Sequence, residues 1–394
     1  MLHTISHYME FVILLFLAVQ VFYLFFFSVA GKLRPRKIIA EAKDLRRIRV
    51  FIPGYKEDAV IIATAHEAIQ HNYPKELFDV VIIADSFSAA TLNTLDKLPL
   101  TVVEVSFEKS TKGKALQKAI EATAQHPVDI VVVIDADNHM APGFLHAVNN
   151  AFEAGYTVMQ GHRTAKNSQT AFALLDACTE EINNHIFRRG HVAVGLPSAL
   201  IGSGMAFSWP LFISLLRDIG DTPGEDKELE FRIVRRRIPI AFLDGSYVYD
   251  EKVSNSGVFS KQRSRWLATQ VEFFQKYYLE GWSQLFRGNI AFFNKVFQTY
   301  LLPRVMLMAA MIAWILFVLL FAPQFILISL LLLAVLAIAL LIGIPSRWYN
   351  RQLLNAFMQV PGALFSMIKA MFQIGKARKK FIHTPHGETA QNNH

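Results

Sequence analysis

The stretch "VVVIDADN", Val131 to Asn138, places two carboxylates directly after a run of β-branched residues. Such a run is typical of a buried β-strand. A single aspartate at a strand end is often only a helix cap or a turn former. Two aspartates at positions i and i+2, here Asp135 and Asp137, can instead bind one divalent cation that also holds two phosphates. The stretch therefore predicts a metal-dependent site at the end of a buried strand.

The segment around this strand alternates between strand-like and helical patterns. Four short apolar runs have strand length, namely "RVFIPGY", "FDVVIIAD", "LTVVEVS" and "DIVVVIDAD". Helical patterns over Asp58 to His71 and Lys114 to Ala124 lie between them. This alternation predicts an α/β fold with a mostly parallel sheet that is covered on both faces. In such a sheet, ligands bind beyond the carboxyl ends of the strands. The residues at those ends are Pro53 to Glu57, Asp85 with Ser86, and Asp135 to Asp137.

The composition indicates a membrane protein. With 53% hydrophobic and 12% aromatic residues among 394, the chain is too apolar for one soluble enzyme. Three charge-free runs are long enough to span a bilayer, and they cover Phe11 to Ala30, Val305 to Ala322 and Phe325 to Ile344. The last two are separated by only two residues, which predicts a helical hairpin. A basic cluster follows the first run instead of preceding it, so we expect an uncleaved anchor and not a secretory signal.

The basic residues also predict the topology. The cluster from Lys32 to Arg49 belongs in the cytosol by the positive-inside rule, and we expect residues 32 to about 300 on the same side of a bacterial inner or plasma membrane. The net charge of +8 then reflects topology and lipid headgroups, not nucleic-acid binding. Residues 353–375 could form a further span, but the basic residues after them favour an interfacial or re-entrant segment. The single cysteine, Cys178, excludes an intramolecular disulfide and suits a reducing compartment.

These patterns divide the chain into five parts. We expect an anchor (1–31), a cytosolic α/β domain (32–280), an interfacial helix region (281–304), a transmembrane hairpin (305–345), and an interfacial segment with a cytosolic tail (346–394). The fold class is therefore α/β with N-terminal and C-terminal transmembrane helices.

A second acidic cluster lies in "TPGEDKELEFRIVRRR", where Gly224 precedes an acidic first turn of a predicted helix. Glu225 and Asp226 provide carboxylates apart from the proposed metal pair. A general base needs that separation, because a metal-bound aspartate is too weak a base for a hydroxyl. The plain alternative is that the acidic turn only complements the helix dipole.

A third motif is "KQRSRWLATQ", which places Gln262, Arg265 and Trp266 on one face of a helix. An indole suits stacking on a sugar, and a guanidinium suits a pyrophosphate. Trp266 could alternatively serve only in helix packing. The segment "STKGKALQKA" is not a phosphate-binding P-loop, because Glu108 stands where its first glycine should be and Ala115 where its Ser or Thr should be.

Taken in order, these motifs resemble family 2 glycosyltransferases, the membrane-embedded group that includes cellulose, chitin and hyaluronan synthases. The resemblance runs from Arg49 to about Leu279. It implies a GT-A (Rossmann-like) domain, inverting transfer from a nucleotide sugar such as a UDP-sugar, and Mg²⁺ or Mn²⁺ held by Asp135 and Asp137. It also implies Asp226 as the catalytic base.

The resemblance further implies which residues bind the substrates. The nucleotide-binding residues would be Pro53, Tyr55, Glu57, Asp85, Lys112, Asp135 and Arg265. The acceptor-binding residues would be Gly202, Ser203, Gly204, Glu225, Gln262 and Trp266. Near the end, "FIHTPH" is similar to a gating loop of cellulose synthases, and Thr384 and His386 would then contact the diphosphate. The plain alternative is an ordinary tail.

The acceptor stays open at this point. A growing polysaccharide is one expectation, because the Q-x-x-R-W signature is associated with processive members of the family. A single transfer to a membrane lipid is the alternative, because some lipid-glycosylating relatives carry the same signature. A transporter is disfavoured by the small number of spans and the lack of an internal repeat. We therefore expect a nucleotide-sugar donor, a glycan or lipid acceptor, membrane lipids, no nucleic acid, and either a second copy or an export partner if the product is a polymer.

Overall fold

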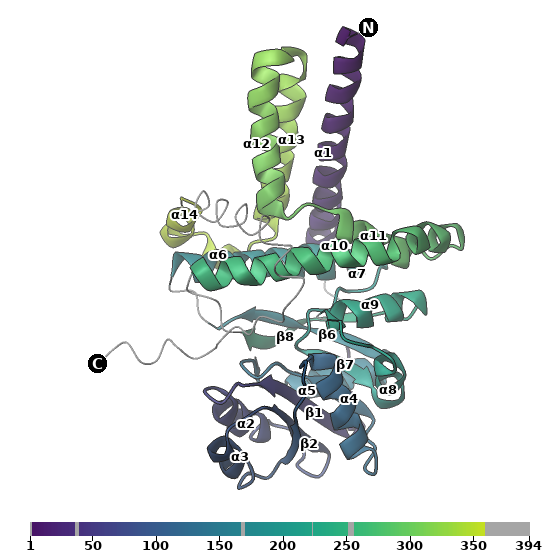
Figure 1. Cartoon of the computed structure of the whole chain (residues 1–394), viewed down its shortest axis with the longest axis vertical. Helices are drawn as coiled ribbons and strands as arrows, with labels where there is room; N and C mark the ends of the chain where they lie inside the picture. The colour runs from purple at the N-terminus through teal and green to yellow at the C-terminus, as the bar shows by residue number, and fades with distance from the viewer. Residues whose placement is uncertain (1, 36–38, 167–169, 223, 251–255, 359–394) are drawn as a thin grey trace.

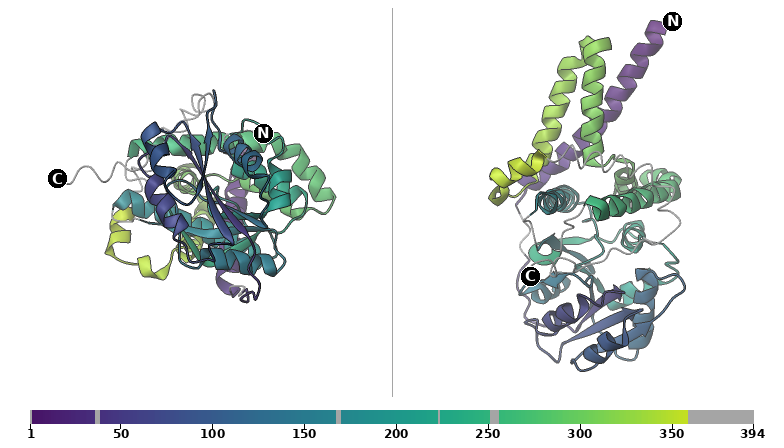
Figure 2. Two further views of the ribbon diagram at one scale, coloured as in Figure 1. Left: turned by 90° about the horizontal axis from the view of Figure 1, so that it is seen from below. Right: turned by 60° about the vertical axis from the view of Figure 1, so that its left-hand side comes forward.

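The computed structural model describes residues 2–35, 39–166, 170–222, 224–250 and 256–358. Figures 1 and 2 show three levels along the long axis: a group of long helices, a level of helices that cross them, and an α/β domain. The N-terminus lies at the far end of the long helices from the α/β domain (Figure 1).

The α/β domain contains one mixed sheet with the strand order β3-β2-β1-β4-β7-β6-β8-β5. Its strands are β1 (Ile48–Tyr55), β2 (Phe78–Asp85), β3 (Thr101–Val105), β4 (Ile130–Val133), β5 (His139–Met140), β6 (Val158–Ala165), β7 (Met205–Ser208) and β8 (Ala241–Asp250). The part from β3 to β4 is parallel, as predicted. The central strand β7 runs antiparallel to both β4 and β6, while β6 and β8 are parallel to each other. The α/β class is confirmed.

The central strands are buried on both faces, which explains their continuous apolar runs. Successive residues of β1 alternate between two cores: Val50 and Ile52 pack on one face, and Phe51 packs on the other. Helices α2 (Ile61–Ile69) and α5 (Phe144–Glu153) supply residues to the first core. Helices α4 (Lys112–Thr123), α8 (Trp209–Leu216) and α9 (Glu225–Arg235) supply residues to the second. The short helix α3 (Ala89–Leu95) contacts α2.

Three helices match the predicted spans. They are α1 (Leu2–Leu33), α12 (Arg304–Phe321) and α13 (Ile326–Ile342), and the short turn at Pro323–Phe325 makes α12 and α13 a hairpin. Within the described residues, segments His7–Leu33, Arg304–Phe321 and Pro323–Ile342 are long and apolar enough to cross a membrane. Helix α14 (Arg351–Phe357) follows. Most of the segment 353–375 lies outside the described residues, so its interfacial placement stays a prediction.

Two helices, α10 (Ser256–Phe286) and α11 (Ile290–Tyr300), lie between the long helices and the α/β domain (Figures 1 and 2). They run across the direction of the long helices. A continuous helical segment contacts both the sheet and α1. It consists of α6 (Ala171–Asn183), the π-helical segment η1 (Asn184–Gly190) and the single turn α7 (His191–Ala193). Segment η1 packs directly on α1.

Glycine permits that close packing. A Cβ atom on Gly190 would lie 2.2 Å from the carbonyl oxygen of Phe27, so only glycine fits where η1 meets α1. Nearby, the ring of His191 stacks on Phe27 with centroids 4.0 Å apart, and Nε2 of His185 lies 2.8 Å from the carbonyl oxygen of Ser28. The cytosolic end expected for α1 is therefore fixed against the α/β domain.

Candidate active site

The predicted strand-end residues meet at one edge of the sheet. Tyr55 and Asp85 are paired in register at the ends of β1 and β2. Asp135 follows β4, whose last residue pairs with Phe51 of β1. Asp85 is buried and accepts a hydrogen bond from the Ser86 hydroxyl at 2.9 Å. The ends of three parallel strands thus bring a phenol and two carboxylates to the edge where ligands bind in this fold class.

The first strand ends in a tight turn. Pro53 lies within β1, and the backbone carbonyl of Glu57 accepts hydrogen bonds from the first residues leading into α2. A Cβ atom on Gly54 would lie 2.7 Å from the ring of Phe87, so the turns after β1 and β2 are in close contact. Pro53, Tyr55 and Glu57 thus lie at the carboxyl end of β1 or just beyond it, and their contact with a nucleoside stays a prediction.

Lys112 is the first residue of α4, and Thr111 caps this helix by accepting a hydrogen bond from the Lys114 amide at 3.3 Å. The ammonium group of Lys112 contacts the carboxylate of Asp135 and donates to the carbonyl oxygen of Gly202 at 2.6 Å. Although burial opposes it, the negative charges of Asp135 and Glu225 raise the pKa of Lys112 above its ordinary value. The side chain is therefore a fixed positive charge beside the D-x-D motif.

The predicted acceptor loop, Gly202 to Gly204, lies against the same motif. Both glycines have positive φ, +86° at Gly202 and +67° at Gly204, which other residues rarely adopt. The backbone N–H of Asp135 donates to Oγ of Ser203 at 3.0 Å. The Gly204 N–H donates to the carbonyl oxygen of Val133 at 2.9 Å, at the start of β7. The loop is thereby fixed to the end of β4.

The second acidic cluster faces this loop. Helix α9 begins at Glu225, immediately after Gly224, as predicted. A Cβ atom on Gly202 would lie 3.9 Å from both Cβ and Oδ2 of Asp226, so the side chain of Asp226 lies beside the loop. Glu225 is buried, and its Oε1 lies 3.8 Å from Nζ of Lys112. Burial raises the pKa of Glu225 to about 7, although Lys112 opposes the shift. Two carboxylates in different environments thus lie opposite the D-x-D motif.

The donor set fits a divalent cation that shares its ligands with a substrate. Among the described residues, no group of three or more His, Cys, Asp or Glu side chains gathers around one point. Mg²⁺ in phosphate-binding sites is, however, commonly held by one or two carboxylates plus substrate phosphates. Asp135 and Asp137 supply two such half-buried carboxylates after the end of β4, and Asp135 contacts Lys112.

The remaining predicted site residues lie on α10 or beyond the described part of the chain, and the roles of all the predicted site residues stay predictions. Gln262 and Arg265 lie on α10, but their side chains are outside the description. Trp266 lies on the same helix and is 40% exposed, which leaves its ring accessible. Thr384 and His386 lie outside the described residues.

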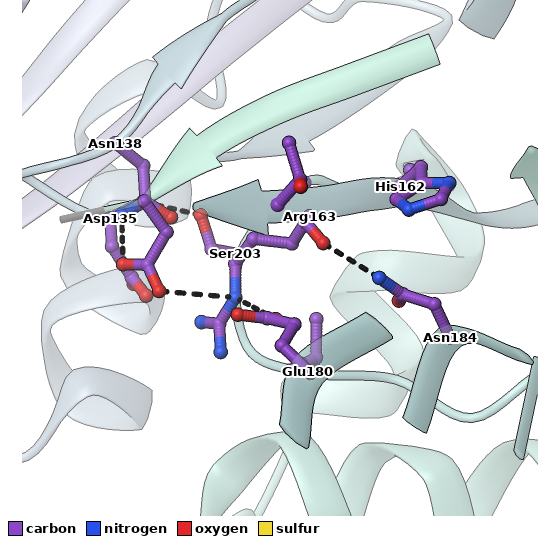
Figure 3. A network of polar contacts seen from close by, with 12 residues as sticks. Asp135, Asn138, His162, Arg163, Glu180, Asn184 and Ser203 are labelled. Atoms are coloured by element: carbon purple, nitrogen blue, oxygen red, sulfur yellow. Dashed lines mark hydrogen bonds and ion pairs between the residues drawn. The ribbon is translucent and has the colours of Figure 1, made fainter. Parts of the chain in front are cut away.

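A network of charged side chains beside Asp135 was missed by the sequence analysis (Figure 3). Nε of Arg163, on β6, donates to Oε1 of Glu180, on α6, at 2.7 Å and lies 3.7 Å from Oδ2 of Asp250. Asn138 in turn donates to Asp250 at 2.9 Å. The sequence signal for this network is the presence of charged residues, such as Arg163 and Glu180, within otherwise apolar strand and helix segments. That signal does not indicate which of these residues pair.

The protein-family model described as "Glycosyltransferase like family 2" matches residues 46–269, which is more than half of the chain. The chain belongs to glycosyltransferase family 2. The matched residues include every strand of the sheet, the D-x-D motif, the acidic cluster and Trp266. The resemblance found in the sequence is confirmed.

Two curated relatives and one solved structure are similar over long stretches. The chain is 25% identical over 270 residues to a β-monoglucosyldiacylglycerol synthase of Trichormus variabilis, covering 65% of this chain and 55% of that protein. It is 23% identical over 234 residues to the probable glycosyltransferase YdaM of Bacillus subtilis, covering 57% and 55%. The chain thus spans about half the length of the curated relatives that it matches.

The fold is also similar to that of a mannosyltransferase from Pyrobaculum calidifontis, solved with GDP-Man and Mn²⁺. The TM-score is 0.57 at 15% identity, and the similarity covers 93% of this chain and 98% of that chain. At this identity the likeness concerns the fold alone, and it includes the regions outside the α/β domain.

Proposed function

We propose that this family 2 enzyme is an inverting β-glycosyltransferase that moves a sugar from a nucleotide sugar, such as a UDP-sugar, to an acceptor at the membrane surface. One observation carries the proposal. Lys112 connects the D-x-D carboxylate of Asp135 with the loop at Gly202 and the acidic start of α9. Donor-side and acceptor-side groups therefore meet around one point.

The roles of the residues follow from this arrangement. A Mg²⁺ or Mn²⁺ ion held by Asp135 and Asp137 would neutralise the departing nucleoside diphosphate. Lys112 adds a fixed positive charge beside that position. Asp226 takes the proton from the acceptor hydroxyl, because it faces the Gly202 loop and is not part of the D-x-D pair. Attack from the side opposite the leaving group converts an α-linked donor into a β-linked product.

A membrane lipid is the acceptor that we favour. The loop at Gly202 follows a segment in which the Ala199 N–H donates to the carbonyl oxygen of Phe187 in η1, at 3.1 Å. Segment η1 in turn packs on α1, a candidate membrane span. The relative from Trichormus variabilis is named a β-monoglucosyldiacylglycerol synthase, and a diacylglycerol product supports the same choice.

A growing polysaccharide is the second candidate, supported by the Q-x-x-R-W signature at Gln262, Arg265 and Trp266. A polymer would also need a route across the membrane, which a second copy or an export partner would have to complete. Both candidates place the α/β domain in the cytosol, where nucleotide sugars are available.

The experiment is a screen of radiolabelled nucleotide sugars with the purified full chain, Mg²⁺ or Mn²⁺, and bacterial membrane lipids. Transfer of label into one chloroform-soluble glycolipid supports the lipid acceptor. Label in a large water-soluble product supports the polysaccharide instead. If no nucleotide sugar is consumed with any lipid or glycan acceptor while the protein stays folded, the proposed function is wrong.

A further inference from the structure

The side-chain amide of Asn138 joins two carboxylates from distant parts of the chain. Its Nδ2 donates to Oδ1 of Asp137 at 3.0 Å and to Oδ1 of Asp250, at the end of β8, at 2.9 Å. Carboxylate oxygens accept hydrogen bonds and do not donate them, so the two aspartates determine which end of the amide faces them. The orientation of the Asp137 carboxylate is therefore tied to the end of β8.

This bridge costs free energy of folding, because it buries the other end of the Asn138 amide without a hydrogen bond among the described residues. The residue is only 1% exposed, and its Oδ1 has no hydrogen-bond partner among the described residues. Most buried polar atoms in folded proteins are hydrogen-bonded, because an unpaired one loses its contacts with water. A side chain that served only stability would be expected to satisfy both ends of its amide. The geometry therefore favours a role in the neighbouring site.

Positive charge supports the far side of the bridge. Nε of Arg163 lies 3.7 Å from Oδ2 of Asp250 and donates to Oε1 of Glu180 at 2.7 Å. Although burial opposes it, the charges of Glu180 and Asp250 raise the pKa of Arg163, so the guanidinium stays charged. Figure 3 shows Asn138, Arg163 and Glu180 as neighbouring members of one network. Arg163 thus offsets the repulsion that two aspartates around one amide would otherwise create.

We propose that Asp250 is a positioning residue that acts through Asn138 to hold the carboxylate of Asp137 in the orientation for binding the divalent cation. Asp250 does not itself contact the cation. The inference rests on the proposed function, because it assigns Asp137 to the metal site. It extends that site to β8 and, through Arg163 and Glu180, to α6. Partners that orient a metal ligand commonly change metal affinity by about 10- to 100-fold when removed.

The test measures Mn²⁺ binding directly, by the electron paramagnetic resonance signal of free Mn²⁺ added to the purified full chain with UDP. Asp250→Ala is expected to weaken Mn²⁺ binding by about 10- to 100-fold. Asp250→Asn retains an oxygen that can accept from Asn138, so its loss is expected to be smaller. The matched control is Asp244→Ala on the same strand. Its carboxylate pairs with Arg189 and His162, not with Asn138, so Mn²⁺ affinity should stay at the wild-type value.

A double-mutant cycle separates positioning from direct ligation. Because Asp250 acts through Asn138, Asp250→Ala should have no further effect on Mn²⁺ affinity in an Asn138→Ala background. A further loss in that background would mean that Asp250 binds the cation itself, and would overturn the proposal. If Asp250→Ala does not fold, Asn138→Ala alone must weaken Mn²⁺ binding for the proposal to stand.

The remaining outcomes distinguish this inference from the proposed function. If the wild-type protein binds Mn²⁺ and folded Asp250→Ala binds it with the same affinity, the positioning role is overturned and the proposed function stands. Failure of the wild-type protein to bind Mn²⁺ in the presence of UDP overturns the metal-dependent function and this inference together.

Discussion

Nζ of Lys112 lies 2.6 Å from the carbonyl oxygen of Gly202, a residue 90 positions later in the chain. The same ammonium group contacts the carboxylate of Asp135 and lies 3.8 Å from Oε1 of Glu225. One partly buried positive charge therefore joins the end of β4, the loop at Gly202 and the start of α9.

Lys112→Met should reduce turnover by about 100-fold or more, because it removes a fixed charge where the diphosphate would develop negative charge. Steady-state transfer assays with the full chain measure this loss. Lys114→Met is the matched control, since Lys114 lies two residues on in the same helix and pairs with Asp221 on the surface. Equal activity of the two variants would exclude Lys112 from the site.

Asp226→Asn should lower transfer by about 10²- to 10⁴-fold, because it keeps the shape of the side chain and removes the base. UDP binding, measured by calorimetry, should stay near the wild-type value. Near-normal turnover in this variant would show that another group, such as Glu225, accepts the proton.

Glu225→Gln should change how stability depends on pH. Burial raises the pKa of Glu225 to about 7 from an ordinary value of 4.5. The folded chain therefore favours the protonated acid. The stability linked to that proton is full below about pH 4.5 and is lost as pH rises through 7.

Thermal unfolding in detergent at several pH values measures this effect. The unfolding midpoint of Glu225→Gln should exceed that of the wild type at pH 8 and approach it at pH 4.5. A constant difference across this range would mean that Glu225 does not titrate there.

Trp266→Ala should lower the use of acceptor more than the hydrolysis of donor without acceptor, because a stacking platform acts on the sugar or headgroup being extended. Trp282→Ala is the control, since Trp282 lies on the same helix with a similar exposure, 43% against 40%. Assays of both activities give the comparison. A parallel fall of both activities, with poor expression, would mean that Trp266 serves helix packing.

A cysteine at Thr389 tests the predicted topology and the reach of the tail at Thr384 and His386. It should resist a membrane-impermeant thiol reagent in intact cells and react after permeabilisation, because the basic residues after 375 favour a cytosolic tail. The native Cys178 should contribute little signal, since it is buried and burial raises its pKa to about 12. Labelling in intact cells would place the tail outside and exclude a gating role for it.

Local patterns of the sequence predicted much of this enzyme. The three spans, the strands before Tyr55, Asp85 and Asp135, and the start of α9 after Gly224 all follow from residues that are neighbours in the chain. Helix α4 begins at Lys112, two residues before the predicted start, because Thr111 caps it. A cap shifts a helix end by one turn or less, and it does not change the fold.

The α/β class, the three long apolar helices and the D-x-D motif can all be read from short stretches of the chain, because burial, helix length and paired carboxylates are local properties. Three features became known only from the packed fold: β7 runs antiparallel to its neighbours, Lys112 lies between Asp135 and Gly202, and Asp250 accepts a hydrogen bond from Asn138. Those contacts join residues that are tens to more than a hundred positions apart. Hydrophobic periodicity specifies which face of an element is buried, whereas the polar partner across a fold depends on how the elements pack.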